Sequence, residues 1–160
     1  MSVTDVQKDA SNLTMTIIAE FHAGISQVWN LFEDPRKLER WWGPLAYPAT
    51  FIDHDLSPGG RMSYFMTGPD GDLARGWWRI LELEAPQRLV FENGIAGDDG
   101  NPDPSMPFML MEILLSERSD GVTRLTVKTL FPSVAAMEQF ISMGMEEGLT
   151  QAISQIDALL

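Results

Sequence analysis

Three polar side chains in the sequence could move a proton or hold a polar group of a ligand: Glu112, Arg61 and His54. Glu112 is the most distinctive, because the segment around it, from Phe108 to Leu115, is otherwise wholly apolar. A carboxyl group enclosed by such a segment could act as an acid or anchor a ligand. The alternative is that Glu112 faces water on the outer side of a sheet, and the sequence leaves both open.

His54 lies between Asp53 and Asp55, an arrangement in which a carboxylate could orient an imidazole for proton transfer. Successive side chains of a strand point to opposite faces, however, which would put both aspartates on the face opposite His54. A surface or hydrogen-bonded structural role is therefore the better interpretation of this histidine. The sequence contains no G-x-S-x-G motif and no glycine-rich nucleotide loop. We predict no metal site and no cofactor.

A second group of residues could line a pocket for an apolar ligand, because aromatic rings and flexible thioethers fit apolar molecules of varied shape. The same residue types also fill irregular protein cores. The candidates fall on the C-terminal helix and on the segments that are expected to surround it. They are Trp42, Tyr64, Trp78, Phe91, Met109, Met111, Phe140 and Gly144.

Trp77 and Trp78 are adjacent on one predicted strand, so only one of them can face such a pocket. Trp78 alternates in phase with the apolar Ile80 but also with two glutamates further along the strand. Trp77 alternates in phase with Arg79 and two leucines. The pattern is nearly balanced, and we assign Trp78 to the pocket.

The composition excludes several functional classes. The chain has 23 acidic and 11 basic residues, a net charge of -12, and its basic residues are scattered, so charge opposes binding to nucleic acid or to an anionic membrane. The absence of cysteine excludes disulfides, a thiolate nucleophile and cysteine metal sites. No segment approaches the roughly 20 apolar residues needed for membrane insertion, and the N-terminus has no signal-peptide pattern. We therefore expect a cytoplasmic protein.

The element expected to organise the fold is the C-terminal segment from Ser133 to Leu160. Its apolar residues recur at helical spacing, which predicts one long amphipathic helix with Ser133 as the N-cap. Gly144 and Gly148 interrupt the apolar face, which indicates either the close approach of a strand or open space beside the helix. A curved sheet wrapped around this helix would bury its apolar face.

The rest of the chain predicts strands that surround this helix. Residues 1–11 are polar and are expected to form a flexible N-terminal tail, whereas residues 12–160 should form a single domain. Alternation of apolar and polar residues predicts a first strand over 12–21.

Two short helices should follow the first strand, over 27–32 with Ser26 as N-cap and over 35–42 with Asp34 as N-cap. Turn residues rich in glycine and proline then separate consecutive segments of strand character. These segments predict six further antiparallel strands, at 49–56, 61–66, 73–84, 88–94, 107–117 and 122–131.

The longest irregular segment is residues 95–105, which is rich in glycine, proline and aspartate. This composition predicts an exposed loop, and two roles are open to it. The loop could be a lid beside the entrance of a cavity, with hinges at Gly94, Gly97 and Gly100. It could equally be a hairpin tip that points away from any pocket.

Five short segments resemble, in this order along the chain, the START-like, polyketide-cyclase-like superfamily. More narrowly, they resemble its branch named after the activator of the heat-shock-protein ATPase. The segments are 28–35, the Trp-Trp-Gly-Pro run at 41–44, the segment 55–60 with its Pro-Gly-Gly turn, Pro-Asp-Gly at 69–71, and 82–91 with its Pro-x-Arg-Leu-Val run.

The resemblance covers roughly residues 13–160 and implies an α+β helix-grip fold. In this fold a curved antiparallel sheet wraps around a long C-terminal helix, two short helices follow the first strand, and a cavity lies between the helix and the sheet. Two positions depart from the family pattern: Trp78 stands where a glycine usually opens the strand, and Leu149 stands where tryptophan is common. Both changes alter the volume of the cavity, so the ligand of a relative cannot be transferred to this chain.

The resemblance implies that the cavity binds a small hydrophobic or aromatic ligand. A first alternative is a cyclase-, dehydratase- or hydrolase-like enzyme, in which the shape of the cavity and polar residues such as Glu112, Arg61 or His54 perform the chemistry. A second alternative, which rests on the branch name alone, is a co-chaperone-like protein interaction. The sequence does not determine the oligomeric state, and a homodimer is compatible with it.

Overall fold

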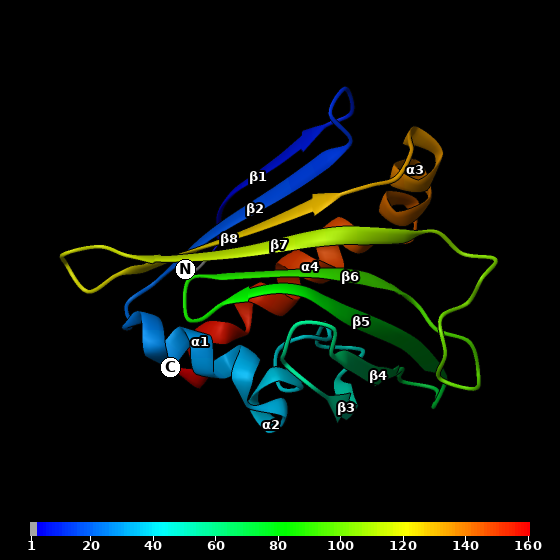
Figure 1. The fold of residues 1–160 in the computed structure, drawn as a ribbon, viewed down its shortest axis with the longest axis horizontal. Helices are drawn as coiled ribbons and strands as arrows, with labels where there is room; N and C mark the ends of the chain where they lie inside the picture. Colours follow the sequence, from blue (N-terminus) through cyan, green and yellow to red (C-terminus); the bar gives the residue numbers. More distant parts are fainter. Residues whose placement is uncertain (1–2) are drawn as a thin grey trace.

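The structure, a computed structural model, describes residues 3–160, which form an eight-stranded antiparallel sheet curved around the C-terminal helices (Figure 1). The strand order is β1-β2-β8-β7-β6-β5-β4-β3, so β1 and β3 are the two edges. This arrangement confirms the predicted α+β helix-grip fold. The elements in chain order are β1 (Val3–Asp9), β2 (Thr14–Phe21), α1 (Ile25–Glu33), α2 (Pro35–Leu38), β3 (Ala49–His54), β4 (Arg61–Thr67), β5 (Leu73–Glu84), β6 (Arg88–Ile95), β7 (Phe108–Glu117), β8 (Thr123–Leu130), α3 (Val134–Ser142), α4 (Met145–Ser154) and the 3-10 helix η1 (Ile156–Leu159).

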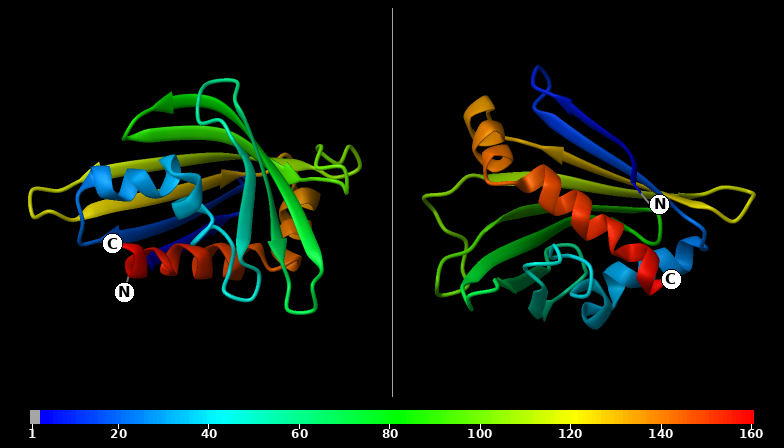
Figure 2. Two further views of the ribbon diagram at one scale, coloured as in Figure 1. Left: turned by 90° about the horizontal axis from the view of Figure 1, so that it is seen from below. Right: turned by 180° about the vertical axis from the view of Figure 1, so that it is seen from behind.

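Strand alternation places the apolar core on the concave side of the sheet. In β2 the side chains of Met15, Ile17, Ala19 and Phe21 are fully buried, while the residues between them are only half-buried. Helix α4 crosses this concave face, and α1 lies near the C-terminal end of the chain (Figure 2). The concave face and α4 therefore enclose the core.

The N-terminal segment corrects one prediction, because residues 3–9 form strand β1 rather than a flexible tail. Strand β1 pairs antiparallel with β2, and its Val3 side chain is buried. Lys8 also reaches Glu146 of α4, with Nζ 2.6 Å from Oε1. The polar sequence hid this strand because an edge strand has only one neighbour and exposes most of its side chains. Residues 1 and 2 of the predicted tail lie outside the described residues.

The predicted long C-terminal helix is wrong in one respect, since it is broken into α3 and α4. Ser133 is the N-cap of α3, as predicted, and its hydroxyl accepts a hydrogen bond from the Ala136 backbone N–H at 3.0 Å. The break falls at Met143 and Gly144, where Gly144 adopts the left-handed conformation with φ of 87°. A glycine reaches this conformation without the steric cost of a Cβ atom. The change of direction places α3 at one end of the sheet (Figure 2).

The two short helices follow the prediction in part. Asp34 caps α2 by accepting a hydrogen bond from the Arg36 backbone N–H at 2.9 Å, but α2 ends at Leu38 instead of continuing to 42. Helix α1 begins earlier than predicted, at Ile25, so Ser26 is not its N-cap. The Ile25 backbone N–H donates instead to the Glu117 carboxylate at 2.8 Å. That partner lies 92 positions away in the sequence, which no local pattern reveals.

Candidate functional site

A cavity of about 270 Å³ lies between the concave face of the sheet and the junction of α3 with α4. Strands β4 to β7 supply one wall, and the two helices supply the other. Apolar side chains and backbone glycines dominate its lining. The lining residues are Trp42, Pro44, Tyr64, Met66, Ala74, Arg75, Gly76, Asn93, Gly94, Ile95, Met109, Met111, Phe140, Met143, Gly144, Met145, Gly148 and Leu149.

Six of the eight residues predicted to line a pocket do so; Trp78 and Phe91 do not. We assigned Trp78 rather than Trp77 to the pocket, and Trp78 is on the concave face but does not line the cavity, while Trp77 packs against Phe108 with ring centres 5.6 Å apart. Trp78 and Phe91 stack on each other at 3.9 Å one layer below the cavity, and Trp42 meets the Trp78 ring edge-on at 4.7 Å. The two predicted residues are therefore part of the packed core that supports Trp42.

The Trp-Trp-Gly-Pro run holds Trp42 against the cavity through its neighbours. Trp41 is buried, and its indole N–H donates to the Leu31 carbonyl at 2.9 Å. The Gln155 side chain, at the end of α4, donates to the carbonyls of Gly43 at 2.7 Å and of Trp41 at 3.3 Å. A side chain at Gly43 would overlap the backbone of residue 47, so the tight turn requires glycine. Gln155 was missed in the sequence because its partners lie more than 110 positions away.

Tyr64 lies on the inner wall, where its phenol ring covers Gly76 on the neighbouring strand β5. A Cβ atom at residue 76 would overlap the phenol ring, so the ring can occupy this position only because residue 76 is glycine. Burial raises the pKa of the Tyr64 hydroxyl to about 12, although the nearby indole N–H groups of Trp42 and Trp78 lower it. Tyr64 is therefore neutral at pH 7.

Asn93 on β6 is a buried polar residue of the cavity wall that sequence reasoning missed. It is 7% exposed, and its side chain makes two weak hydrogen bonds among the described residues. Its Oδ1 lies 3.5 Å from the Tyr64 hydroxyl, and its Nδ2 lies 3.2 Å from the Met111 thioether. The signal was present in the sequence, because Asn93 alternates in phase with the predicted wall residue Phe91.

Methionines and a glycine shape the helix side of the cavity. Met143 and Met145 lie on either side of the helix break. On the opposite wall, Met66 lines the cavity from β4. Nothing lies within 4 Å of the position that a Cβ atom of Gly148 would take. Of the two explanations considered for the glycines on this helix, Gly148 therefore fits open space beside the helix.

Comparison with known proteins identifies the family of the chain. Residues 22–160 match the family described as Activator of Hsp90 ATPase homolog 1-like protein. The chain belongs to this family. A crystal structure of a protein from Mycobacterium smegmatis has 46% sequence identity and a TM-score of 0.91, with 99% of this chain and 96% of that chain covered. A solution structure of a protein from Arthrobacter aurescens has 45% identity and a TM-score of 0.94, with 99% and 91% covered.

More distant structures share the fold alone. The AHSA1 protein from Silicibacter pomeroyi has 20% identity and a TM-score of 0.73, with 91% of this chain and 95% of that chain covered. A search among curated proteins found no match. Family membership therefore agrees with the observed helix-grip fold and assigns no ligand.

The three acid-base candidates lie outside the cavity lining. Glu112 is on the convex face, the second of the two alternatives, where its carboxylate accepts a hydrogen bond from Arg88 at 2.9 Å. The Arg61 guanidinium donates to the Gly100 carbonyl at 2.6 Å. His54 Nε2 lies 2.9 Å from the Phe32 carbonyl, in agreement with a structural role. The structure does not bring these three residues together with the cavity.

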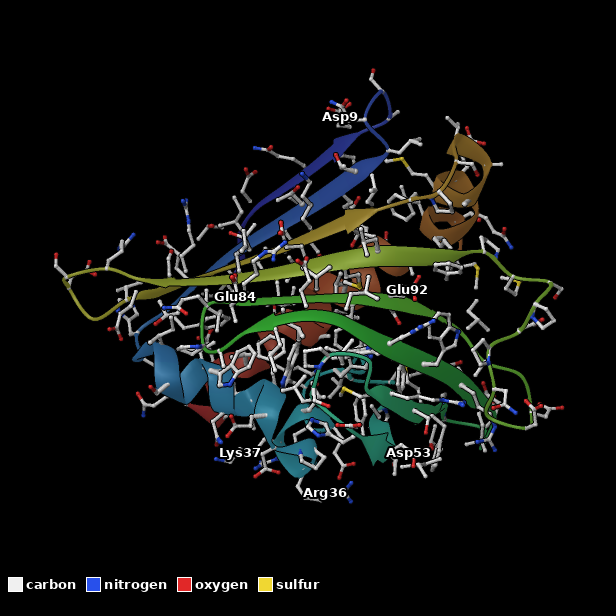
Figure 3. The ribbon with its side chains drawn as sticks, in the orientation of Figure 1. Asp9, Arg36, Lys37, Asp53, Glu84 and Glu92 are labelled. Carbon is white, nitrogen blue, oxygen red and sulfur yellow. The ribbon has the colours of Figure 1, made fainter. Side chains whose placement is uncertain are left out.

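The 95–105 segment does not cover the cavity. Only Ile95 lines it, whereas residues 98–101 border an outer groove together with Arg61 and His54. Backbone hydrogen bonds close the loop on itself: the Asp103 N–H donates to the Ile95 carbonyl at 3.0 Å, and the Gly97 N–H donates to the Asn101 carbonyl at 2.8 Å. Figure 3 looks onto this outer side of the sheet, where charged side chains such as Glu84 and Glu92 are found. The arrangement matches the second role considered for the loop, a tip that points away from the pocket.

Proposed function

We propose that this protein binds a small apolar or aromatic molecule in the cavity between the concave sheet and the junction of α3 with α4. The observation that carries the proposal is the cavity itself, about 270 Å³ in volume and lined by five methionines together with Trp42, Tyr64 and Phe140. Thioethers and aromatic rings attract apolar and aromatic molecules and adapt to their shape.

The size of the cavity favours a ligand over imperfect packing. Protein interiors are packed as densely as organic crystals, and voids larger than a water molecule are few. An engineered apolar cavity of about 150 Å³ already binds benzene. A cavity of about 270 Å³ therefore has room for a larger molecule, such as a two-ring compound.

Thermal unfolding with 2-isopropylnaphthalene, an apolar two-ring probe, tests the proposal. A ligand that binds only the native state at 100 times its Kd adds about 2.7 kcal/mol, which raises the midpoint by roughly 5 to 10 °C in a chain of this length. Gly148→Leu is the matched control, because its side chain would extend into the open space beside α4. The shift should be present in the wild type and lost in this variant. An unchanged wild-type midpoint with this probe and with a panel of lipids, flavonoids and polyketides would overturn the proposal.

The remaining expectations about function stay predictions. A cyclase-, dehydratase- or hydrolase-like reaction in the same cavity is the alternative function, but the positions of Glu112, Arg61 and His54 do not support a role for them in it. A co-chaperone-like interaction, a homodimer and a cytoplasmic location also stay predictions. Within residues 3–160, no helix is long and apolar enough to cross a membrane.

A further inference from the structure

The cavity contains hydrogen-bonding groups but very little charge. Tyr64 and Arg75 are the ionisable residues in its lining. The guanidinium carbon of Arg75 lies 5.7 Å from the centre of the Phe65 ring, and Phe65 points to the convex face because it alternates with Tyr64. Tyr64 is neutral at pH 7, as its raised pKa of about 12 requires. No charged side chain of the described residues is therefore directed into the cavity.

The hydroxyl of Tyr64 is placed to act as a donor. The indole N–H groups of Trp42 and Trp78 are close enough to the Tyr64 oxygen to lower its pKa. Neither N–H makes a hydrogen bond of good geometry within residues 3–160. Within the described residues, the Tyr64 hydroxyl is a hydrogen-bond donor directed towards Asn93. Its nearest acceptor is Asn93 Oδ1, at a long 3.5 Å.

Asn93 adds a second donor beside this hydroxyl. Its Nδ2 carries two hydrogens, and the Met111 thioether at 3.2 Å can only accept, which fixes the orientation of the amide. A thioether is a weak acceptor, and one Nδ2 hydrogen has no partner among the described hydrogen bonds. A buried amide without good partners costs free energy that a bound acceptor would restore.

We propose that the natural ligand is uncharged and carries a carbonyl oxygen, which accepts hydrogen bonds from the Asn93 amide and the Tyr64 hydroxyl while its apolar body fills the methionine-lined part of the cavity. This inference rests on the proposed function, because it names the class of ligand that the same cavity takes. A carbonyl oxygen can accept two hydrogen bonds. Asn93 and Tyr64 can supply two neutral donors side by side, because Asn93 Oδ1 lies 3.5 Å from the Tyr64 hydroxyl.

An anionic ligand does not fit the same site. A buried carboxylate needs a cation or several strong donors to offset the loss of hydration. Arg75, the cationic residue of the lining, has its guanidinium over the Phe65 ring, whereas Glu146 and Glu147 lie in the first turn of α4, which begins at the cavity. The net charge of -12 adds to the repulsion.

Three probes of nearly equal shape test the inference by calorimetric titration: 2-isopropylnaphthalene, 2-acetylnaphthalene and 2-naphthoate. The first has no acceptor, the second a neutral carbonyl and the third a charge at pH 7. The measured quantity is the ratio of the Kd values of the first two probes, compared between the wild type and Asn93→Leu. A hydrogen bond of about 1 kcal/mol predicts that the substitution weakens the carbonyl probe about fivefold more than the apolar probe.

Two further variants keep the test decisive. Tyr64→Phe removes the second donor with almost no change of shape, so it reports on the same carbonyl even if Asn93→Leu fails to fold. Met109→Leu, another substitution in the lining, should change both Kd values by the same factor. 2-Naphthoate should bind more weakly than either neutral probe at pH 7.

The outcomes separate this inference from the proposed function. If neither neutral probe binds, this inference is wrong, and if the panel of lipids, flavonoids and polyketides also leaves the thermal midpoint unchanged, the proposed function is wrong as well. If both bind and the Kd ratio is unchanged in Asn93→Leu and Tyr64→Phe, the cavity binds apolar molecules but carbonyl recognition is wrong. Tighter binding of 2-naphthoate than of 2-acetylnaphthalene would overturn the conclusion that the ligand is uncharged.

Discussion

At the residue scale, the buried Tyr64 of the cavity wall affects how the stability of the whole protein depends on pH. The chain has two tyrosines, Tyr47 and Tyr64, and they differ sharply in environment. Tyr64 is buried, and desolvation raises its pKa to about 12. Tyr47 is only half-buried, and the nearby Asp72 carboxylate raises its pKa because a phenolate there would be repelled. Titration should therefore distinguish the two phenols.

Tyr64→Phe is predicted to remove a loss of stability that the wild type shows at alkaline pH. An unfolded tyrosine ionises near pH 10, whereas folded Tyr64 keeps its proton until about 12. Between these values the unfolded state binds fewer protons, so the stability present below pH 10 falls as the pH rises through 12. The full effect is about 2 to 3 kcal/mol.

Urea unfolding between pH 8 and 11.5 measures this loss of stability, with Tyr47→Phe as the control that should retain the pH dependence. Equal pH dependence in wild type and Tyr64→Phe would show that this phenol is not buried as described.

At the element scale, two glycines of the C-terminal region should respond in opposite directions to the same substitution. Gly144→Ala places a Cβ at a φ of 87°, which should cost about 1 to 2 kcal/mol and strain the break between α3 and α4. Gly148→Ala lies inside α4 with open space around its Cβ, so the higher helix propensity of alanine should add up to about 1 kcal/mol. The free energy of unfolding in urea measures both. Two shifts of the same sign would contradict the assigned conformations.

Elements with a strong local pattern were predictable from the sequence, and those set by distant partners were not. Strand β5 has the predicted bounds because turn residues mark both of its ends and its interior is rich in strand-forming residues. The break at Gly144 was not predicted, since apolar spacing continues through it and only the backbone conformation reveals it. Strand β1 was also missed, because its identity depends on the free edge of β2.

The candidate site shows the same division. Alternation and helical spacing selected six residues that line the cavity, including Trp42, Met109 and Phe140. The depth of a residue below the cavity surface depends on how the layers stack, so Trp78 and Phe91 could not be separated from true wall residues in advance. Asn93 could not be recognised by apolar alternation or by an ionisable group, because a neutral amide is neither apolar nor ionisable.

At the scale of the whole molecule, the open sheet has a charged convex side and a concave side that holds the cavity. The long loop that the sequence offered as a lid borders an outer groove with Arg61. The cavity meets α3 and α4 where Met143 is 58% exposed and Gly144 interrupts the helix. Residues 142–147 at this junction are exposed or only half-buried, so local opening there is the expected route for a ligand.

Hydrogen exchange with and without 2-isopropylnaphthalene should locate that route. Amides at the junction, residues 142–148, should exchange through local opening in the free protein and slow when a probe packs against Phe140, Met143 and Met145. Amides of β6 and β7 exchange through larger openings, and bound probe should slow them together by the same stabilisation of the native state. Residues 96–105 should be unaffected, because none of them lines the cavity. Gly148→Leu with the probe supplies the control without binding. If the probe slowed exchange only at residues 96–105 and left the junction unchanged, the loop would act as a lid after all. The junction of α3 with α4 would then not be the entrance.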